Sequence, residues 1–185
     1  MRIVGGEHRG RKLVSPEGVS TRPTSDRVRE AVFNILRGDI LDAVVFDAFS
    51  GSGAMALEAI SRGAKRAYAC ESDKSAQQTL RKNIALCRAE HVVTFFPSPW
   101  QAAISKMREV IDIVFCDPPY AMHEAYGDVL SALEKARLLR ENSIAVLEYP
   151  SADPQPRVPG GWEIFDIRKY GASSVAFARQ TGCGA

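Results

Sequence analysis

Strand-like and helix-like patterns alternate along this chain from Val44 onward, and this alternation restricts its possible folds more than any other feature. Successive β-α units place their strands parallel in one sheet, with the helices packed against its faces. Apolar runs of five or six residues predict five such strands, at Val44–Phe49, Arg66–Cys70, Val92–Phe96, Ile111–Cys116 and Ile144–Tyr149. We therefore expect an α/β, Rossmann-like fold with a mostly parallel sheet and helices on both faces.

Amphipathic stretches with helical spacing fill the intervals between these strands. They predict helices at Ala54–Arg62, Asp73–Leu86, Trp100–Glu109 and Ala121–Leu139. An earlier helix is expected to begin after Thr24 or Ser25, either of which can cap its first turn, and to end at Gly38.

Two further strand-like runs close the chain, at Trp162–Lys169 and Ser174–Ala178, around Gly171. They predict a hairpin that adds one antiparallel strand at an edge of the sheet. The connector Ala152–Gly161 is too short to separate domains, and 185 residues fit a single core. We therefore expect one α/β domain over residues 24–185, preceded by a short N-terminal arm over residues 1–23.

The N-terminal segment is more basic than the rest of the chain. Residues 1–37 contain eight Lys and Arg against four Asp and Glu, which leaves 16 basic and 18 acidic residues in the remainder. Glycines at 5, 6 and 10 punctuate two short segments, Arg2–Val4 and Arg11–Val14, and predict a small hairpin with a charged loop. A basic arm on a mildly acidic body is typical of a polyanion-binding surface, although ordinary solvated charges would look the same.

Composition excludes several other classes of protein. No apolar run approaches the roughly 20 residues that a membrane span needs, and the N-terminus lacks the apolar core of a signal peptide. The four cysteines, Cys70, Cys87, Cys116 and Cys183, have no zinc-site spacing and are expected to be reduced structural residues. We therefore expect a cytoplasmic protein without a metal or membrane partner.

A glycine loop follows the first predicted strand. Asp47 ends the strand, and Phe49, Ser50, Gly51 and Gly53 lead into the next helix. Glycines let the backbone turn sharply and approach a ligand closely, and ligands of open α/β sheets bind beyond the carboxyl ends of the strands. Glu71 closes the next strand, where its two oxygens can accept hydrogen bonds from a ribose diol.

The loop by itself leaves three interpretations open. Its spacing also satisfies the dinucleotide fingerprint, and a glycine turn without a ligand matches such motifs by chance. Asp47 argues against a dinucleotide, because a carboxylate at the strand end would repel a pyrophosphate. It suits a cationic ligand instead, such as the amino-acid end of S-adenosylmethionine.

A second loop, Asp117-Pro118-Pro119-Tyr120, follows the apolar run that ends at Cys116. Consecutive prolines fix the backbone and remove two donors, which leaves carbonyls that only accept. The Asp117 carboxylate and the Pro118 carbonyl can hold the two N–H groups of an exocyclic amine and turn its lone pair toward a methyl donor. Tyr120 can stack on an extruded base. The alternative is a strand that ends in a proline turn with Asp117 as its cap.

Three blocks together resemble the RsmD family, bacterial methyltransferases of small-subunit (16S) ribosomal RNA. They are Arg2–Gly6 with Arg9–Leu13, Thr21–Glu30 with Phe33-Asn34, and the two loops just described. The resemblance runs from Arg2 to about Tyr149 and is looser in the terminal hairpin. It implies a seven-stranded class I methyltransferase fold, a monomer, and methyl transfer from S-adenosyl-L-methionine to the N2 amine of a guanine in the RNA or in the assembling 30S subunit.

The resemblance also implies roles for individual residues. The cofactor positions of the family map onto Asp47, Gly51, Gly53 and Glu71, and we expect Phe49, Ser50, Ser72 and Ser98 beside them to contact the cofactor as well. The catalytic, amine-holding motif maps onto Asp117, Pro118, Pro119 and Tyr120, and the RNA-binding positions are Arg9, Arg11, Lys12, Arg22 and Arg27. One departure concerns Pro97-Ser98-Pro99-Trp100, where family members offer a small or acidic pair near the adenine. Pro99 removes a backbone donor there.

Two other functions remain open from the sequence. A DNA or RNA adenine-N6 or cytosine-N4 methyltransferase uses the same Asp-Pro-Pro-Tyr chemistry, but 185 residues leave little room for a target-recognition domain. A non-catalytic RNA-binding module would have no need of an intact amine-holding motif.

Overall fold

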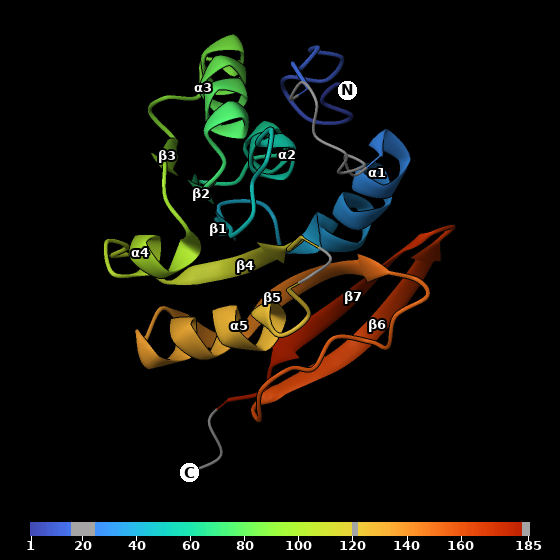
Figure 1. Cartoon of the computed structure of the whole chain (residues 1–185). Helices are drawn as coiled ribbons and strands as arrows, with labels where there is room; N and C mark the ends of the chain where they lie inside the picture. The colour runs from blue at the N-terminus through green and yellow to red at the C-terminus, as the bar shows by residue number, and fades with distance from the viewer. Residues whose placement is uncertain (16–24, 120–121, 183–185) are drawn as a thin grey trace.

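Seven strands in the described part of the chain form one sheet, in the spatial order β3-β2-β1-β4-β5-β7-β6 (Figure 1). The structure is a computed structural model that describes residues 1–15, 25–119 and 122–182. The strands are β1 (Val44–Asp47), β2 (Arg66–Cys70), β3 (Val93–Phe96), β4 (Ile111–Cys116), β5 (Leu139–Pro150), β6 (Trp162–Tyr170) and β7 (Ser173–Gln180).

The sheet is parallel from β3 to β5, and β7 runs antiparallel to both of its neighbours, β5 and β6. This confirms the mostly parallel sheet and the antiparallel strand contributed by a terminal hairpin. The chain moves outward from β1 through β2 to β3, and then crosses back to β4 on the other side of β1. The reversal creates a topological switch point between β1 and β4, where open α/β sheets bind ligands.

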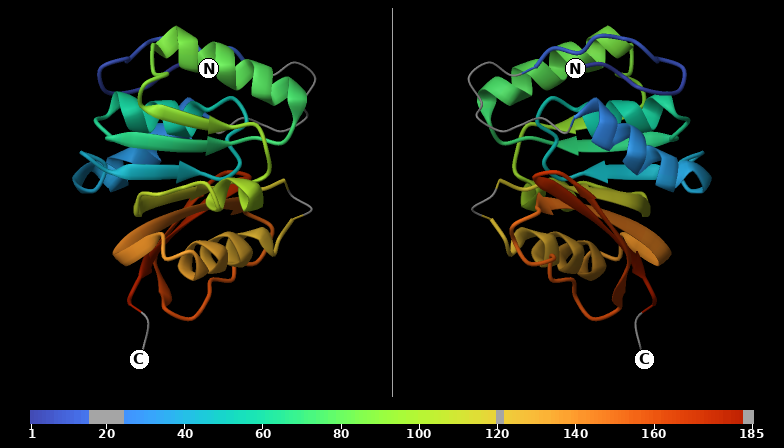
Figure 2. Two further views of the ribbon diagram at one scale, coloured as in Figure 1. Left: turned by 90° about the vertical axis from the view of Figure 1, so that its left-hand side faces the viewer. Right: turned by 90° about the vertical axis from the view of Figure 1, so that its right-hand side faces the viewer.

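Helices cover both faces of the sheet (Figure 2). They are α1 (Asp26–Ile35), the 3-10 turn η1 (Leu36–Gly38), α2 (Ala54–Ser61), α3 (Lys74–Cys87), α4 (Trp100–Ile104) and α5 (Ala125–Lys135). Side chains of α1, α2 and α3 share one buried apolar cluster, and those of α4 and α5 share the other. The sheet therefore separates two hydrophobic layers, as the alternating sequence pattern predicts.

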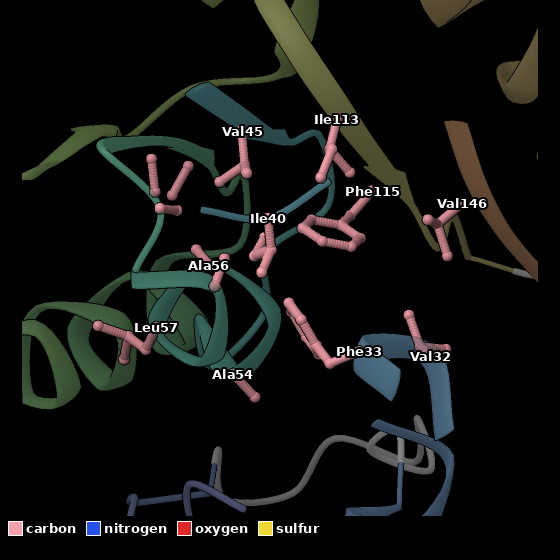
Figure 3. Close-up of a cluster of buried hydrophobic side chains, with 14 of the residues drawn as sticks. Val32, Phe33, Ile40, Val45, Ala54, Ala56, Leu57, Ile113, Phe115 and Val146 are labelled. Carbon is pink, nitrogen blue, oxygen red and sulfur yellow. The ribbon is translucent and has the colours of Figure 1, made fainter. Parts of the chain in front are cut away.

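The layer beneath α1 and α2 positions the carboxyl ends of the central strands (Figure 3). Phe33 of α1 is fully buried, and its ring centre lies 5.6 Å from that of Phe115 on β4. Val45 and Ile113, paired across β1 and β4, are fully buried in the same layer. Burying a side chain such as Phe33 contributes about 2 to 3 kcal/mol relative to its exposure.

Side chains cap the first turns of two helices. The Ser25 hydroxyl accepts a hydrogen bond from the Val28 N–H at 3.2 Å and begins α1. The Asp73 carboxylate accepts one from the Ala76 N–H at 2.8 Å and begins α3. The alternative cap Thr24 lies outside the described residues. Each such cap contributes about 1 kcal/mol.

Several predicted elements have different bounds in the structure, and the largest differences lie at the first strand, two helices and the fifth strand. The first strand stops at Asp47, before Phe49, because the chain there already turns into the glycine loop. The predicted helix 100–109 ends at Ile104, where the Ser105 hydroxyl bonds back to the Ala102 carbonyl at 3.1 Å and competes with further helical hydrogen bonds.

The predicted helix 121–139 begins only at Ala125 and ends at Lys135. Arg137 then adopts a left-handed conformation, and the Leu138 N–H reaches the Leu133 carbonyl at 3.0 Å, which closes the helix. The chain turns directly into β5, which starts five residues earlier than the predicted strand at Ile144. The Ser143 hydroxyl stabilises this extension through the Ile111 carbonyl at 2.8 Å.

The N-terminal segment forms a minimal hairpin that packs against α2 and α3. Its bridge joins Arg2 to Lys12, and Ile3 and Leu13 are buried in the same layer as α1 and α2. The Glu58 carboxylate of α2 accepts hydrogen bonds from the backbone N–H groups of Val4 and Gly5, both at 2.8 Å.

No helix in ranges 1–15, 25–119 and 122–182 is long and apolar enough to cross a membrane. Those ranges also hold no group of three or more His, Cys, Asp and Glu side chains arranged for a metal ion. Cys70, Cys87 and Cys116 are buried free thiols, as expected, and Cys183 lies outside the described residues.

Candidate active site

A cleft of about 620 Å³ opens at the switch point between β1 and β4. Its walls are the segments that follow β1, β2 and β4, together with the end of β5 and the start of α4. The two loops singled out in the sequence therefore face one cavity. Among the predicted cofactor residues, Asp47, Phe49, Ser50, Gly51, Glu71, Ser72 and Ser98 line it.

The glycine loop connects β1 to α2 through left-handed backbone. Gly51 and Gly53 have φ angles of 51° and 80°, a region that favours glycine. Gly53 is not among the residues lining the cleft, and a Cβ at this position would lie 2.1 Å from Leu80 Cδ1 of α3. We infer that Gly53 shapes the loop from behind, by letting α2 and α3 approach, whereas Gly51 faces the cleft.

Glu71 fixes the glycine loop to the end of β2. Its Oε2 accepts the Gly51 N–H at 2.8 Å, and its Oε1 accepts the Asp73 N–H at 2.7 Å. Each carboxylate oxygen has a second lone pair, so these bonds leave acceptor capacity for a diol. The contact of Glu71 with a ribose stays a prediction.

Asp47 is buried at the base of the cleft, with 3% of its surface exposed. Its Oδ2 has no hydrogen-bond partner among the described residues. Burial, reinforced by the charge of Glu71, raises the pKa of Asp47 to about 7, against the opposing effect of backbone N–H groups at Ala56 and Phe49. A buried acceptor without a partner costs free energy, and a cationic ligand in the cleft would recover it.

The opposite wall is the turn that follows β4. Asp117, Pro118 and Pro119 line the cleft, and Tyr120 lies outside the described residues. Asp117 is exposed at the cleft wall. Incomplete solvation inside the cleft, followed by the negative charges of Glu148 and Asp47, holds the pKa of Asp117 well above its usual range.

The electrostatic character of the cleft decides between the two classes of cofactor. Its described lining includes the five carboxylates Asp47, Glu71, Asp73, Asp117 and Glu148, and it includes no Lys, Arg or His side chain. Such a lining repels the pyrophosphate of a dinucleotide and attracts a cation. The geometry therefore favours a sulfonium and ammonium ligand over NAD.

Sequence reasoning missed several residues of the cleft. Glu148 sits inside the apolar run Ile144–Tyr149 and belongs to no recognisable motif. Asn83 lies behind the wall, where its side-chain N–H groups bind the carbonyls of Ser52 and Val14. An acidic residue at the end of a strand next to the Asp117 strand was the one available signal for Glu148.

Among the predicted RNA-binding residues, the described ones, Arg9, Arg11, Lys12 and Arg27, lie outside the cleft lining. Arg9, Lys12 and Arg27 are exposed, and Arg22 lies outside the described residues. Arg11 is half-buried, and its Nη1 donates to the Leu86 carbonyl at the end of α3 at 2.7 Å. The hairpin borders the cleft through Met1, which is part of the lining.

A doubly wound sheet with this antiparallel β7, a glycine loop after β1 and an Asp-Pro-Pro turn after β4 defines a class I methyltransferase. Comparisons with known proteins identify the family. The family model described as "Conserved hypothetical protein 95" matches residues 1–179. The chain is 36% identical over 177 residues to the ribosomal RNA small subunit methyltransferase D of Escherichia coli, covering 96% of this chain and 87% of that protein. The chain therefore belongs to this family, the RsmD family of methyltransferases.

Solved structures agree with this assignment. A putative methyltransferase from Escherichia coli superimposes with a TM-score of 0.85 at 32% identity, over 98% of both chains. An RNA methyltransferase from Salinibacter ruber, crystallised with S-adenosyl-L-homocysteine, matches with a TM-score of 0.65 at 16% identity, over 86% of this chain and 94% of that one. The second likeness concerns the fold alone. Together these findings confirm the family and the fold that the sequence predicted.

Proposed function

We propose that this chain transfers a methyl group from S-adenosyl-L-methionine to the N2 amine of a guanine in bacterial small-subunit ribosomal RNA. The observation that carries the proposal is that the glycine loop and the Asp117–Pro119 turn line one acidic cleft. Relatives named as small-subunit ribosomal RNA methyltransferases supply the substrate class, since the chain matches them over nearly its full length.

The residues of the cleft fit the cofactor. Asp47 carries a buried oxygen without a partner among the described residues, at the place where a positively charged amino-acid end would be stabilised. The Ser98 hydroxyl on the cleft wall is a second such atom and is a candidate contact for the adenine. Glu71 and Ser72 offer acceptors for the ribose. When bound, S-adenosylmethionine supplies an activated methyl group on a sulfonium.

The amine is held by the turn after β4. A base-bound exocyclic amine is a poor nucleophile because its lone pair is delocalised into the ring. The Asp117 carboxylate and the Pro118 carbonyl each accept one N–H, which orients the lone pair toward the donor and lets a proton leave after transfer. Tyr120 provides a stacking face for a base drawn out of its surroundings.

RNA contacts are assigned to the N-terminal hairpin and the start of α1. Arg9, Arg11, Lys12, Arg22 and Arg27 are the proposed residues, and Arg9, Lys12 and Arg27 are exposed in the described structure. We propose that residues 1–23 act as an RNA-contacting extension of the methyltransferase domain, and that the chain works as a monomer in the bacterial cytoplasm. The Arg11 bond to α3 keeps the hairpin in a fixed orientation.

The test is incubation of the protein with labelled S-adenosylmethionine and unmodified small-subunit RNA, either as a naked transcript or as ribosomal particles, followed by nucleoside analysis. N2-methylguanosine is the expected product. N6-methyladenosine or N4-methylcytidine would move the activity to the alternative amino-methyltransferase class. Cofactor binding without label in either RNA sample would contradict an active RNA methyltransferase.

A further inference from the structure

Glu148 lies beside Asp117 at the carboxyl ends of two paired parallel strands. The register pairs Cys116 with Leu147, so Asp117 and Glu148 are the next residues along β4 and β5. Paired residues of neighbouring strands point to the same face, and such strands run about 4.8 Å apart. Both carboxylates line the cleft. The negative charge of Glu148, followed by that of Asp47, adds to the raised pKa of Asp117.

Neighbouring elements hold Glu148 in place. The Ser173 hydroxyl at the start of β7 donates to Glu148 Oε1 at 2.6 Å. The Tyr126 hydroxyl of α5 donates to the Glu148 carbonyl at 2.8 Å. The β7 bond orients the half-buried carboxylate and the α5 bond holds the Glu148 backbone. A side chain held in this way is a positioned acceptor, which is the requirement for reading a polar edge of a ligand.

The bases that carry exocyclic amines differ in the ring atom next to the amine. In guanine the N2 amine is flanked by N1–H, a donor. In adenine the amine is flanked by N1 and in cytosine by N3, and both of these atoms are acceptors. An ionised carboxylate only accepts, so it binds a ring N–H and is repelled by a ring lone pair.

We propose that Glu148 is the specificity-determining residue of this site, which accepts N1–H of guanine while Asp117 and Pro118 hold the adjacent N2 amine. The proposal rests on the proposed function and names the group that selects the base. The two neighbouring carboxylates match two neighbouring donors of guanine, the N2 amine and N1–H. With adenine or cytosine bound in the same way, Glu148 would face the lone pair of the ring nitrogen and repel it. A site built to bind a donor rejects the analogue that lacks it, because a buried acceptor is then left unpaired.

A purely structural role makes a different prediction. Glu148 could serve only to anchor Ser173 and thereby the β7 strand, in which case its loss would lower stability and reduce methylation of every substrate equally. The two roles are separated by base discrimination, which anchoring of a strand does not affect.

The experiment first locates the guanine that the wild-type protein methylates. Small-subunit RNA is then joined from two pieces so that this position carries guanosine or 2-aminopurine riboside, which keeps the N2 amine but lacks N1–H and the 6-oxo group. Glu148→Gln and the wild type are compared on both RNAs by kcat/KM. Glu163→Gln on the exposed edge strand β6 is the matched control. Cofactor affinity and thermal unfolding are measured for each protein.

For the wild type and the Glu163→Gln control, kcat/KM should be at least about 100-fold higher on the guanosine RNA than on the 2-aminopurine RNA. In Glu148→Gln, kcat/KM should fall about 100-fold on the guanosine RNA. It should fall much less on the 2-aminopurine RNA, because the glutamine N–H can donate to the lone pair of the unprotonated N1. Comparing both proteins on both RNAs forms a thermodynamic cycle. Loss of the 6-oxo group affects both proteins equally, so its contribution cancels in the ratio of their preferences.

Three results would overturn the inference. They are equal wild-type activity on the two RNAs, an unchanged guanosine rate in Glu148→Gln, and an equal loss on both RNAs. If Glu148→Gln does not fold, Ser173→Ala, which removes the hydroxyl that donates to Oε1, takes its place and must lower the preference for guanosine. Failure of the proposed function is distinct, since the wild type would then form no N2-methylguanosine at all.

Discussion

The Glu71 carboxylate and the Gly51 N–H are joined by a 2.8 Å hydrogen bond that spans the ends of β2 and β1. The two residues are 20 positions apart in the chain, and their bond ties the glycine loop to the neighbouring strand. The acceptor and the loop are therefore positioned before any ligand enters. Such preorganisation reduces the ordering cost of binding, and it depends on the backbone conformation that the glycines permit.

We expect Gly53→Ala to destabilise the protein by about 2 to 4 kcal/mol. The alanine Cβ would meet Leu80 Cδ1 at 2.1 Å, and a left-handed φ is itself unfavourable for a side chain. Gly10→Ala is the matched control, because its φ is 84° with no atom within 4 Å of the added Cβ, and it should cost about 1 kcal/mol. Denaturant unfolding measures both. Equal losses would exclude the packing role assigned to Gly53.

Much of the fold could be predicted from the sequence because local patterns agree with the tertiary structure. The bounds of β2 and β4 match the predicted strands at both ends, since both are mainly apolar runs on interior strands that are buried on both faces. The helix ends were less predictable. One helix ends where Arg137 adopts a left-handed conformation, and another ends where the Ser105 hydroxyl bonds back to the Ala102 carbonyl. Neither residue type by itself predicts a helix end.

The candidate site could be predicted where it follows strand ends and not elsewhere. Asp47, Glu71 and Asp117 end three strands, and the switch-point rule brings such residues to one cleft. Glu148 was missed because its strand reads as a buried apolar run, and only the register with β4 places it beside Asp117. Pairing partners of this kind follow from the sheet order, which local patterns do not encode.

Asp47 makes stability and cofactor binding respond to pH in opposite directions. Its pKa rises from 3.8 to about 7 on folding, so the folded chain binds the proton that the unfolded chain has lost between these values. The contribution of this group to the free energy of unfolding is full below about pH 4 and is lost as the pH rises through about 7. The loss amounts to about 4 kcal/mol.

We expect Asp47→Asn to remove this pH dependence and to weaken cofactor binding. In the wild type, affinity for S-adenosylmethionine should increase as the pH rises through about 7, since the ionised carboxylate attracts the cation. Asp39→Asn, at an exposed position, is the control and should behave as the wild type. Calorimetric titrations at pH 6 and pH 8 measure the effect. The same affinity at both pH values in the wild type would remove Asp47 from the cofactor site.

We expect Asp117→Asn to lower kcat by at least about 100-fold while cofactor affinity stays within a few-fold. The asparagine side chain has an NH2 donor in place of one acceptor oxygen, and this donor would face the amine N–H that the carboxylate accepts in the wild type. Because the pKa of Asp117 is raised, the wild-type rate should fall as the pH drops through that pKa and the carboxyl becomes a donor. Single-turnover methylation across pH measures both effects. Full activity of the variant would discard the amine-holding mechanism.

The N-terminal hairpin should contribute to RNA affinity through charge. We expect reversal of Arg9 and Lys12 to glutamate to weaken RNA binding and to reduce the slope of log affinity against log salt by about 1 to 2, with cofactor binding unchanged. Both side chains are exposed, so their replacement should not disturb the core. Reversal of Lys106 and Lys135, exposed beyond α4 and at the end of α5, is the control. An identical slope in the two double variants would exclude the hairpin from the interface.

The buried carboxylate of Glu58 holds this hairpin against the body of the protein. It is fully buried and receives the N–H groups of Val4 and Gly5, the Arg62 guanidinium at 2.7 Å and the Arg29 guanidinium at 3.5 Å. Removing the charge of one member of such a network leaves the others poorly compensated, and this typically costs about 3 to 5 kcal/mol.

We therefore expect Glu58→Gln to lower the free energy of unfolding by about 3 kcal/mol or more, and to increase amide exchange at Val4 and Gly5 before it does so in the sheet. Glu109→Gln is the control, because Glu109 pairs with Lys65 and Arg66 at the surface, where ion pairs contribute about 1 kcal/mol or less. A Glu58 variant as stable as the Glu109 variant would show that backbone packing alone positions the hairpin. In that case the alignment of Arg9 and Lys12 would not depend on the buried network.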